Sequence, residues 1–540
     1  MTLLSNLCKE GIILKNTDTK GAFLQGAFIL TVSTAFVKLA GLLFTLPIAN
    51  MQSVDMSNFY SAYTIYNMFA VLASAGLPVA VSRMVSETLV HGNTDEAKRI
   101  YTVSVRIFTV VGAVIAAVMF FGAGMLAWLI GNPGAQMPIR ILSVTAFCSF
   151  VMSSLRGYFQ GNSLMTYTAF SQVIEAFSKL FFGCALAYVI GKAEFGFMDG
   201  SSGAIAGVSI GAVLAVIYLT FNKNRFMKKI EPSGTAVRAD KVIAKELFRI
   251  AIPVSLGASV MSLVNMIDTA VIMRVLQNGF PFFRGLGYTL DEAKLLYTAF
   301  EHAKKIFNFP SAFIVPFSVS ILPALTSAFT ARDSEGIVKN MSTCFKYALM
   351  LALPAGIGIS VLSGAIMNIF YFNAPEEASA GTPILAVFGI AVVLYAVVSI
   401  SGAILQSFGR VNMPLISLCV GALVKCVLTF LLVGMEDINI LGAPIATCAC
   451  YVVMIAMNLV FLRRYLTGCG IIIVNTLKTL AAALIMGAAT YLVYQPLSSL
   501  AGMKMGGLIS IVIAVIVYAA LVLLLKIVTV KELKSMLRRG

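Results

Sequence analysis

Long apolar runs recur along the chain from Gly21 almost to Lys526, and short polar segments separate them. A helix needs roughly 20 predominantly apolar residues to cross about 30 Å of hydrocarbon, and many of these runs reach that length. The runs lack the alternation of apolar and polar residues that is typical of membrane β-strands. The pattern therefore predicts an all-α integral membrane protein with about fourteen transmembrane helices.

Composition supports this prediction and excludes several classes of function. Hydrophobic residues make up 59% of the 540 residues and charged residues 11%, unlike the composition of a soluble domain. The nine cysteines form no C-x-x-C pair and the chain has two histidines, so neither a metal site nor a disulfide framework is indicated. The sequence contains no phosphate-cradling glycine loop, H-E-x-x-H motif or catalytic triad, so we expect neither an enzyme nor a resident cofactor.

The distribution of charge predicts how the chain is oriented in the membrane. The net charge is +16, and the basic residues gather in loops on one predicted side while the opposite loops are mainly acidic. The positive-inside bias makes the basic side cytoplasmic, which places both termini inside and requires an even number of spans. The bases form no single patch with interleaved aromatic residues, so nucleic acid is not an expected partner.

The longest polar interruption divides the chain into two predicted lobes. It is basic and contains Pro232 and Gly234, as expected for a cytoplasmic linker. The predicted parts are a six-helix lobe at 1–222, the linker at 223–246, a second six-helix lobe at 247–466, and a helix pair with a basic tail at 467–540.

Weak internal matches indicate that the two lobes are repeats of each other. Without gaps, Gln160 aligns with Gln406 and Lys179 aligns with Lys425, both at a spacing of 246 residues. Because each lobe has an even number of helices, the repeats share one orientation and are related by a pseudo-two-fold axis along the membrane normal. Carriers built in this way bind substrate between the lobes near the midplane. A duplication that was kept only for packing is the alternative interpretation.

Several charged side chains lie within the predicted spans, where a central charge costs about 2.5 to 3.5 kcal/mol to insert. Lys38, Lys179 and Lys425 lie deep in three different spans, and neither Lys38 nor Lys425 has an acid within helical reach in its own span. Glu175 precedes Lys179 by four residues, so an internal ion pair is one interpretation of these two. The other interpretation is that such bases line a water-filled cavity.

Other charges lie nearer to the predicted membrane surfaces. Arg83 and Arg156 lie towards the inner ends of their spans, while Lys304 and Lys305 lie in the outer part of another span. The two arginines either extend to the lipid headgroups or add positive charge to the cavity from inside.

The balance of central charges favours an anionic cargo. The bases outnumber the acids Glu175 and Asp268, and Lys179 and Lys425, facing each other from the two lobes, could clamp a diphosphate. Asp268 with nearby Asn265 offers oxygen ligands for a coupling Na⁺, or a protonation site. A simple hydrogen-bonded contact between helices is the alternative for this pair.

Two stretches of the first lobe carry a family resemblance. They are R-G-Y-F-Q-G-N-S-L-M-T-Y-T-A-F-S-Q-V-I-E-A at 156–176 and G-L-P-V-A-V-S-R-M-V-S-E at 76–87. They resemble polysaccharide-transport proteins related to stage V sporulation protein B and to the lipid II flippases of Gram-positive bacteria. These proteins belong to the multidrug/oligosaccharidyl-lipid/polysaccharide exporter superfamily. The resemblance implies a carrier of fourteen helices whose last two form a side groove for a polyprenyl tail.

The resemblance extends to the first span. There T-A-F-V-K-L-A-G resembles the S-R-x-x-G of the flippases, which places Lys38 where they carry a cavity arginine. A further arginine of the flippases is replaced by Phe44 in this chain. This departure leaves the identity of the cargo open.

The function implied by the resemblance is transport of an undecaprenyl-diphosphate-linked saccharide, such as a lipid II-like cell-wall precursor, from the cytoplasmic to the outer leaflet of a bacterial plasma membrane. Na⁺, a proton gradient or the membrane potential would drive it, with membrane lipids and cell-wall synthesis proteins as partners. Two alternatives stay open: a cation-coupled exporter of drugs or metabolites, and a non-transporting assembly factor for cell wall or spore cortex. The expected substrate-binding residues are Lys38, Arg83, Arg156, Glu175, Lys179, Lys304, Lys305 and Lys425, and those expected for ion coupling are Asn265 and Asp268.

Overall fold

The computed structural model describes most of the chain between the end of the first predicted span and the start of the C-terminal tail. The described ranges are 39–193, 198–228, 230–280, 283–320, 322–463 and 470–525, together with Ser33, Phe36, Val37 and Ile527.

Helices account for nearly all of the described residues. The first part of the chain contains the apolar helix Leu39–Ala49, α3 (Met56–Val90), α4 (Thr94–Phe121), α5 (Ala123–Ile130), the 3₁₀ turn η1 (Pro133–Ala135), α6 (Gln136–Gly161), α7 (Met165–Ser178), the π-helix η2 (Lys179–Gly183), α8 (Cys184–Lys192) and α9 (Gly200–Met227).

The second part begins with the long helix α10 and ends with α18. Its elements are α10 (Asp240–Leu276), the antiparallel pair β1 (Gly279–Phe280) and β2 (Phe283–Arg284), α11 (Leu290–Ser320), α12 (Leu322–Thr330), α13 (Ser334–Val361), α14 (Ser363–Phe370), α15 (Pro375–Ser407), α16 (Asn412–Val433), the 3₁₀ turn η3 (Asn439–Leu441), α17 (Gly442–Leu462) and α18 (Gly470–Leu524).

The predicted all-α membrane fold is confirmed. Among the described residues, eleven helices are long and apolar enough to cross a membrane. The predicted fourteen is reached when the shorter helix Leu39–Ala49, helix α11 and the second half of α18 are added. α18 is two helices in one run, because Gly502 has a left-handed φ of 77° that breaks the helical path.

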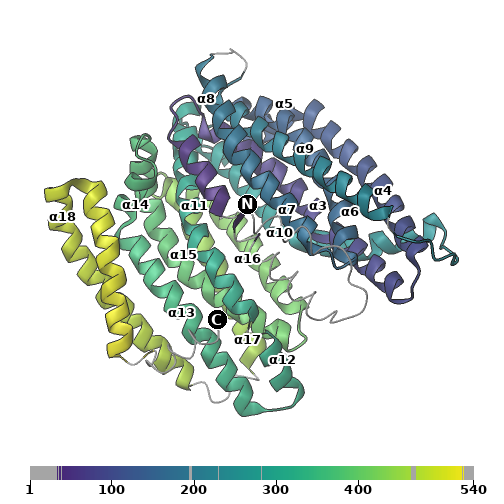
Figure 1. The fold of residues 1–540 in the computed structure, drawn as a ribbon. Helices are drawn as coiled ribbons and strands as arrows, with labels where there is room; N and C mark the ends of the chain where they lie inside the picture. Colours follow the sequence, from purple (N-terminus) through teal and green to yellow (C-terminus); the bar gives the residue numbers. More distant parts are fainter. Residues whose placement is uncertain are drawn as a thin grey trace, which may run out of the picture.

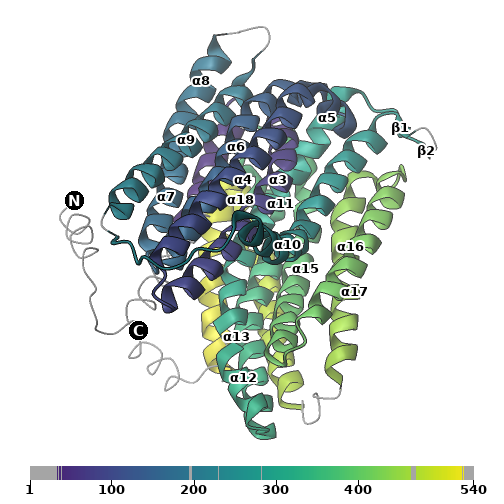
Figure 2. The same ribbon diagram turned by 90° about the vertical axis from the view of Figure 1, so that its right-hand side faces the viewer.

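The helices form two groups that lie inclined to each other, and α10 lies where the groups meet (Figures 1 and 2). In the first group α6 packs against α3, α4 and α9, and in the second group α15 packs against α11, α13 and α17. α6 and α15 are also the most buried of the candidate spans. α18 lies outside the second group, against α13 and α14. The residue boundaries of the two predicted lobes stay predictions.

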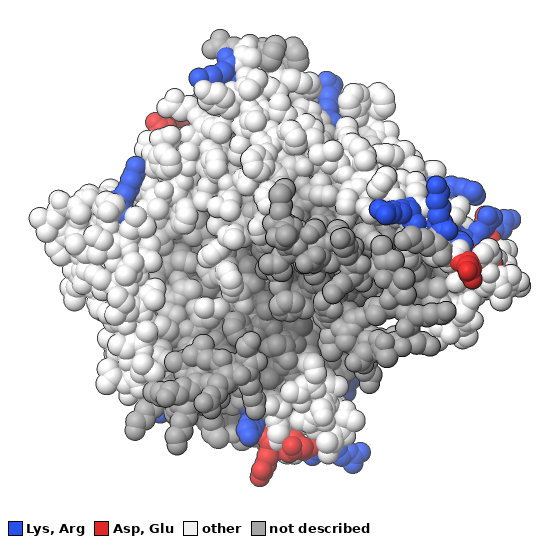
Figure 3. Space-filling view, viewed as in Figure 1, with Lys and Arg blue, Asp and Glu red and all other residues white. Residues whose placement is uncertain are grey.

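Charge is concentrated near the edges of the molecule. On the face drawn in Figure 3, lysine, arginine and acidic side chains gather towards the rim, and the described surface between them is uncharged. The described helices expose many large apolar residues, among them Phe181, Leu256 and Leu492. Such a surface is suited to lipid, because hydrocarbon gives charged groups no solvation.

The predicted linker forms a strap that is hydrogen-bonded to the end of the first group where α3 meets α4, the end that the sequence predicts to be cytoplasmic. The turn between α3 and α4 donates hydrogen bonds to it, from Thr94 Oγ1 to the Glu231 carbonyl at 2.9 Å and from Asn93 Nδ2 to the Ala236 carbonyl at 3.0 Å. Asp95 Oδ2 accepts a hydrogen bond from the Gly234 amide at 2.9 Å. The segment is therefore held along its length rather than extending freely between two bundles.

The Asp95→Ala substitution should loosen this strap, because the amide of Gly234 loses its acceptor. Proteolysis needs local opening of the chain, and one lost hydrogen bond of about 1 kcal/mol corresponds to about fivefold faster tryptic cleavage after Arg238. The rate is measured by mass spectrometry on purified protein. The exposed carboxylate of Asp437, at the opposite end of the bundle, provides the control Asp437→Ala. Equal cleavage rates in all three proteins would show that this hydrogen bond does not hold the strap.

Candidate functional site

Lys179 is the first residue of the π-helix η2, a short segment with a wider helical turn between α7 and α8. The widening is accompanied by very close packing, because a Cβ atom on Gly207 of α9 would lie 2.1 Å from the backbone nitrogen of Gly183. Only glycine allows this approach. The Lys179 amine extends towards the first helix, where a Cβ atom on Gly41 would lie 3.6 Å from Nζ. π-bulges are frequent at functional sites because they redirect side chains.

Lys305 approaches Lys179 from the second group. It lies on α11, and its Nζ is 5.5 Å from the centre of the Tyr60 ring on α3. The charges of the two lysines repel each other. Within the described residues neither amine forms a salt bridge, although Glu175 attracts Lys179 and Glu301 attracts Lys305. The structure therefore brings together two positive charges, one from each group of helices.

The alternative interpretation of Glu175 and Lys179 as an internal ion pair does not hold in this structure. Glu175 is bound by the guanidinium of Arg156, which lies on α6 beside α7. Arg156 also donates from Nε to Ser171 Oγ at 3.0 Å. The guanidinium has several donors in one plane and can serve both acceptors, whereas Lys179 offers a single point charge and extends to the first helix.

Arg156 and Glu175 line a cavity of about 410 Å³ between α3, α6 and α7. The cavity also exposes the amide side chains of Gln160 and Gln172. Among the described residues, Oε1 of Gln172 has no hydrogen-bond partner although it is buried. The cavity thus offers polar groups that can donate to and accept from a hydroxyl-rich ligand.

Arg83 lies away from the site that was predicted for it. Its side chain is 64% exposed and pairs with Glu87 one turn further along α3 at 2.7 Å. The position agrees with the interpretation that this arginine reaches the membrane surface.

Lys304 differs from its neighbour Lys305 because it forms a salt bridge. Its Nζ lies 2.8 Å from Glu301 Oε1, one turn earlier on α11, and the pair is largely buried. Lys304 is thus neutralised within its own helix, while Lys305 is not paired in this way among the described residues.

The predicted pairing of Lys179 with Lys425 is also wrong in this structure. Lys425 is 5% exposed, and its Nζ lies 2.5 Å from Asp268 Oδ2 of α10. Thr429 donates from Oγ1 to Asp268 Oδ1 at 3.4 Å. A carboxylate of a neighbouring helix thus forms a salt bridge with Lys425, whereas Lys179 has no such partner among the described residues.

The same contact changes the prediction of an ion site at Asp268 and Asn265. The carboxylate is already paired with an ammonium, so it presents no free charge to an incoming cation. Among the described residues, no group of three or more histidine, cysteine, aspartate or glutamate side chains could hold a metal ion. Lys38, the remaining predicted residue, lies outside the described residues.

Sequence reasoning missed a set of contacts that joins the two groups at the predicted outer end. Lys294 Nζ of α11 lies 2.7 Å from Asp55 Oδ2, which is at the N-terminus of α3. Asn50 donates from Nδ2 to the Phe370 carbonyl at 2.8 Å and accepts from the Asn373 amide at 2.9 Å. We call these five residues the outer latch. Asn50, Asp55, Lys294 and Asn373 line part of a cavity of about 450 Å³.

A stack of aromatic rings lies directly below the outer latch. The ring of His302 lies parallel to that of Tyr371 at 3.8 Å between centres, and Tyr60 of α3 meets it edge-on at 5.7 Å. His302 is 1% exposed, and neither of its ring nitrogens has a hydrogen-bond partner among the described residues.

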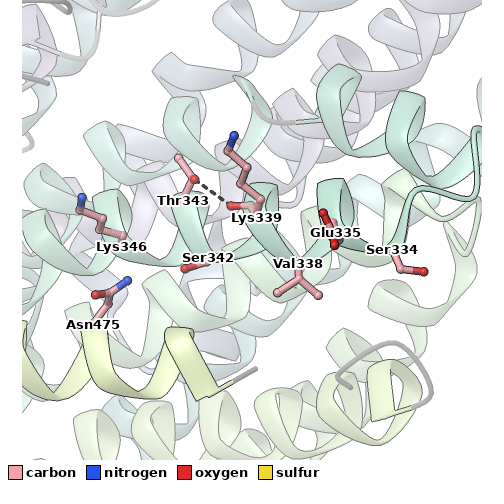
Figure 4. A pocket seen from close by; sticks show the side chains of 8 residues that line it. All are labelled: Ser334, Glu335, Val338, Lys339, Ser342, Thr343, Lys346 and Asn475. Carbon is pink, nitrogen blue, oxygen red and sulfur yellow. Dashed lines mark hydrogen bonds between the residues drawn. The ribbon is translucent and has the colours of Figure 1, made fainter. Parts of the chain in front are cut away.

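Another cavity, of about 530 Å³, lies between α13 and the start of α18. Figure 4 shows Lys339 and Lys346 extending from the same side of α13. Asn475 lines the cavity from the neighbouring helix α18. None of the predicted site residues lines this cavity.

Comparison with known proteins finds a matching family model, described as polysaccharide biosynthesis protein, over residues 23–329. The chain is 25% identical over 513 residues to the lipid II flippase MurJ of Bacillus subtilis, covering 92% of this chain and 93% of that protein. It is 21% identical over 431 residues to stage V sporulation protein B of Bacillus subtilis, covering 79% and 81%. The resemblance noted in the sequence is thereby confirmed.

Two solved structures share the fold. One is described as lipid II flippase MurJ in an inward closed conformation, with a TM-score of 0.69, 16% identity and coverage of 92% of this chain and 98% of that chain. The other is described as the inward-facing conformation of a multidrug resistance MATE family transporter of the MOP superfamily, with a TM-score of 0.66, 15% identity and coverage of 79% and 94%.

A double-mutant cycle tests the ion pair that replaces the predicted one. Arg156→Ala and Glu175→Gln should couple by about 1 to 3 kcal/mol in the free energy of unfolding, because the two groups contact each other and are mostly buried. Lys179→Ala and Glu175→Gln should couple by less than about 0.5 kcal/mol. Reversible denaturation in mixed micelles measures both cycles. A coupling that is larger with Lys179 than with Arg156 would restore the pairing expected from helical spacing.

Proposed function

The chain belongs to the polysaccharide biosynthesis protein family, and on this premise we propose that it flips an undecaprenyl-diphosphate-linked saccharide across a bacterial plasma membrane. The lipid-linked precursor would enter from the cytoplasmic leaflet and leave to the outer leaflet by alternating access. Sequence similarity to the lipid II flippase MurJ of Bacillus subtilis over nearly its full length supports this class of cargo.

One observation supports the proposal: two lysines, Lys179 and Lys305, come from different groups of helices, their charges repel each other, and neither forms a salt bridge with a described residue. Two repelling charges in a poorly solvating environment are costly, and a bound anion would relieve that cost. A diphosphate carries enough negative charge to bridge both amines as hydrogen-bonded ion pairs. Lys305 thus takes the role that the repeat had suggested for Lys425, and Lys38 stays a proposed third ligand.

The cavity at Arg156 suits the sugar portion of the cargo. Gln160, Gln172 and Ser149 line it and offer both donors and acceptors, which saccharide hydroxyls require. Arg156 and Glu175 neutralise each other there, so the cavity offers polarity without net charge.

The outer latch would keep one end of the bundle closed during part of the transport cycle. Every contact in it joins the first group to the second, so the two groups cannot separate at that end while the contacts hold. Alternating access would then require the latch to break when the cargo is released to the outer leaflet.

The alternatives from the sequence have less support. A cation-coupled exporter of organic cations would face the repulsion of Lys179 and Lys305, and the MATE likeness extends to the fold alone. A non-transporting assembly factor for cell wall or spore cortex would leave the two lysines without a role. Both termini in the cytoplasm and contacts with cell-wall synthesis proteins stay predictions.

Neutralising either central lysine should slow flipping. Lys179→Ala and Lys305→Ala should each reduce the rate at least about tenfold, because one charge-assisted contact to the diphosphate is worth about 1.5 to 3 kcal/mol. The rate is measured as appearance of a fluorescent undecaprenyl-diphosphate saccharide in the opposite leaflet of proteoliposomes. Arg83→Ala, a basic residue exposed at the surface, is the matched control and should keep the wild-type rate. Wild-type rates in both lysine variants would disprove the site.

Closing the outer latch covalently should stop transport. In the double variant Asp55→Cys, Lys294→Cys, a short bifunctional thiol reagent should link the two helices and abolish flipping, because the outer end can no longer open. A reagent with a cleavable spacer should restore the rate after reduction. The two single variants, treated identically, control for the native cysteines. Unchanged flipping in protein shown to be cross-linked would mean that this end does not open in the cycle.

A further inference from the structure

α10 is held against the first group along its whole length. In its inner half Ser255 donates from Oγ to the Leu72 carbonyl at 2.9 Å. At its outer end Arg274 donates to the Trp128 carbonyl, and Gln277 donates from Nε2 to the Gly131 carbonyl at 2.9 Å. These contacts make α10 part of the first group, although it opens the second part of the chain.

The ion pair of Asp268 with Lys425 therefore joins the two groups. Among the described residues it is the only salt bridge between α10 and a helix that follows it in the chain. It lies between α10 and α16 and is sealed by α17, whose Cys450 and Tyr451 are 1% and 7% exposed. Asp268 itself is 1% exposed, so the pair is shielded from solvent.

The surroundings of Asp268 are those of a site for a single monovalent cation. One carboxylate and the hydroxyl of Thr429 are the oxygen ligands that a small hard cation prefers. Apart from the Lys425 ammonium, Oδ2 of Asp268 has no hydrogen-bond partner among the described residues. The ammonium thus neutralises a carboxylate that would otherwise be buried as an unpaired charge.

We propose that the Lys425 ammonium is a tethered cation that permanently fills a monovalent cation site formed by Asp268 and Thr429. A covalently attached cation cannot be exchanged with the solution, so no Na⁺ binds at this place during the cycle. This consequence rests on the proposed transport function, whereas the occupancy of the site does not. The side chain would hold the two groups together at α10 and α16 without drawing on an ion gradient.

Removing the tether should create a Na⁺ site. Lys425→Met keeps an unbranched side chain, one atom shorter than lysine, but leaves the buried carboxylate unpaired, which strongly favours an incoming cation. The thermal unfolding midpoint of this variant should rise with NaCl relative to KCl at equal ionic strength, by on the order of 2 °C per tenfold increase above the dissociation constant. The midpoint of the wild-type protein should be the same in both salts.

The double variant Asp268→Asn, Lys425→Met is the matched control. It removes both charges, so it should fold and show no preference between the two salts. If Lys425→Met is recovered only in buffers with NaCl, the proposal is supported. If it is recovered in neither salt while the double variant is recovered, or if it responds equally to NaCl and KCl, the proposal is overturned.

The wild-type protein provides a test that needs no substitution. A selective rise of its unfolding midpoint in NaCl would show that the site accepts a free ion and would overturn the proposal. Because these readouts are unfolding midpoints, they are independent of the cargo. The flipping assays of the Lys179 and Lys305 variants therefore test the proposed function separately from this inference. If the function holds, wild-type flipping should run at the same rate when Na⁺ is replaced by K⁺ on both sides.

Discussion

The cost of placing charged side chains inside a membrane organises the centre of this protein. Each charge that can find a partner has one: Arg156 with Glu175, and Lys425 with Asp268. Lys179 and Lys305 form no such salt bridge with a described residue, and their charges repel each other across the two groups of helices. Because unpaired charges are expensive there, the anionic cargo of the proposed function would offset the cost of keeping them.

The paired charges and the unpaired ones have different effects on motion. A buried ion pair between two helices holds them in one arrangement, since separating the partners leaves an uncompensated charge behind. The partly exposed contact of Lys294 with Asp55 costs less to break, because water can solvate both groups when they part. The outer end is therefore the easier place to open, and the contact at Lys425 is the firmer junction between the groups.

Several features of the site followed directly from sequence patterns. The positions of Lys179 and Lys425 within membrane-spanning helices came from counting along apolar runs. The choice of partners did not follow. Glu175 is four residues from Lys179, which favours a pair within the helix, yet the neighbouring helix α6 presents Arg156 with a better geometry. Helical spacing describes only one helix at a time, so it cannot rank a partner from another.

The sequence by itself determined that the chain is a bundle of membrane helices with basic residues at its core, because apolar length and the insertion cost of charge act locally along the chain. Only the tertiary structure decided which bases stay free. The π-helix directs Lys179 towards the first helix, α11 brings Lys305 beside it, and α10 delivers Asp268 to Lys425. These outcomes depend on helix packing between distant segments, in which the fit of backbones and side chains selects one neighbour among several of similar chemistry.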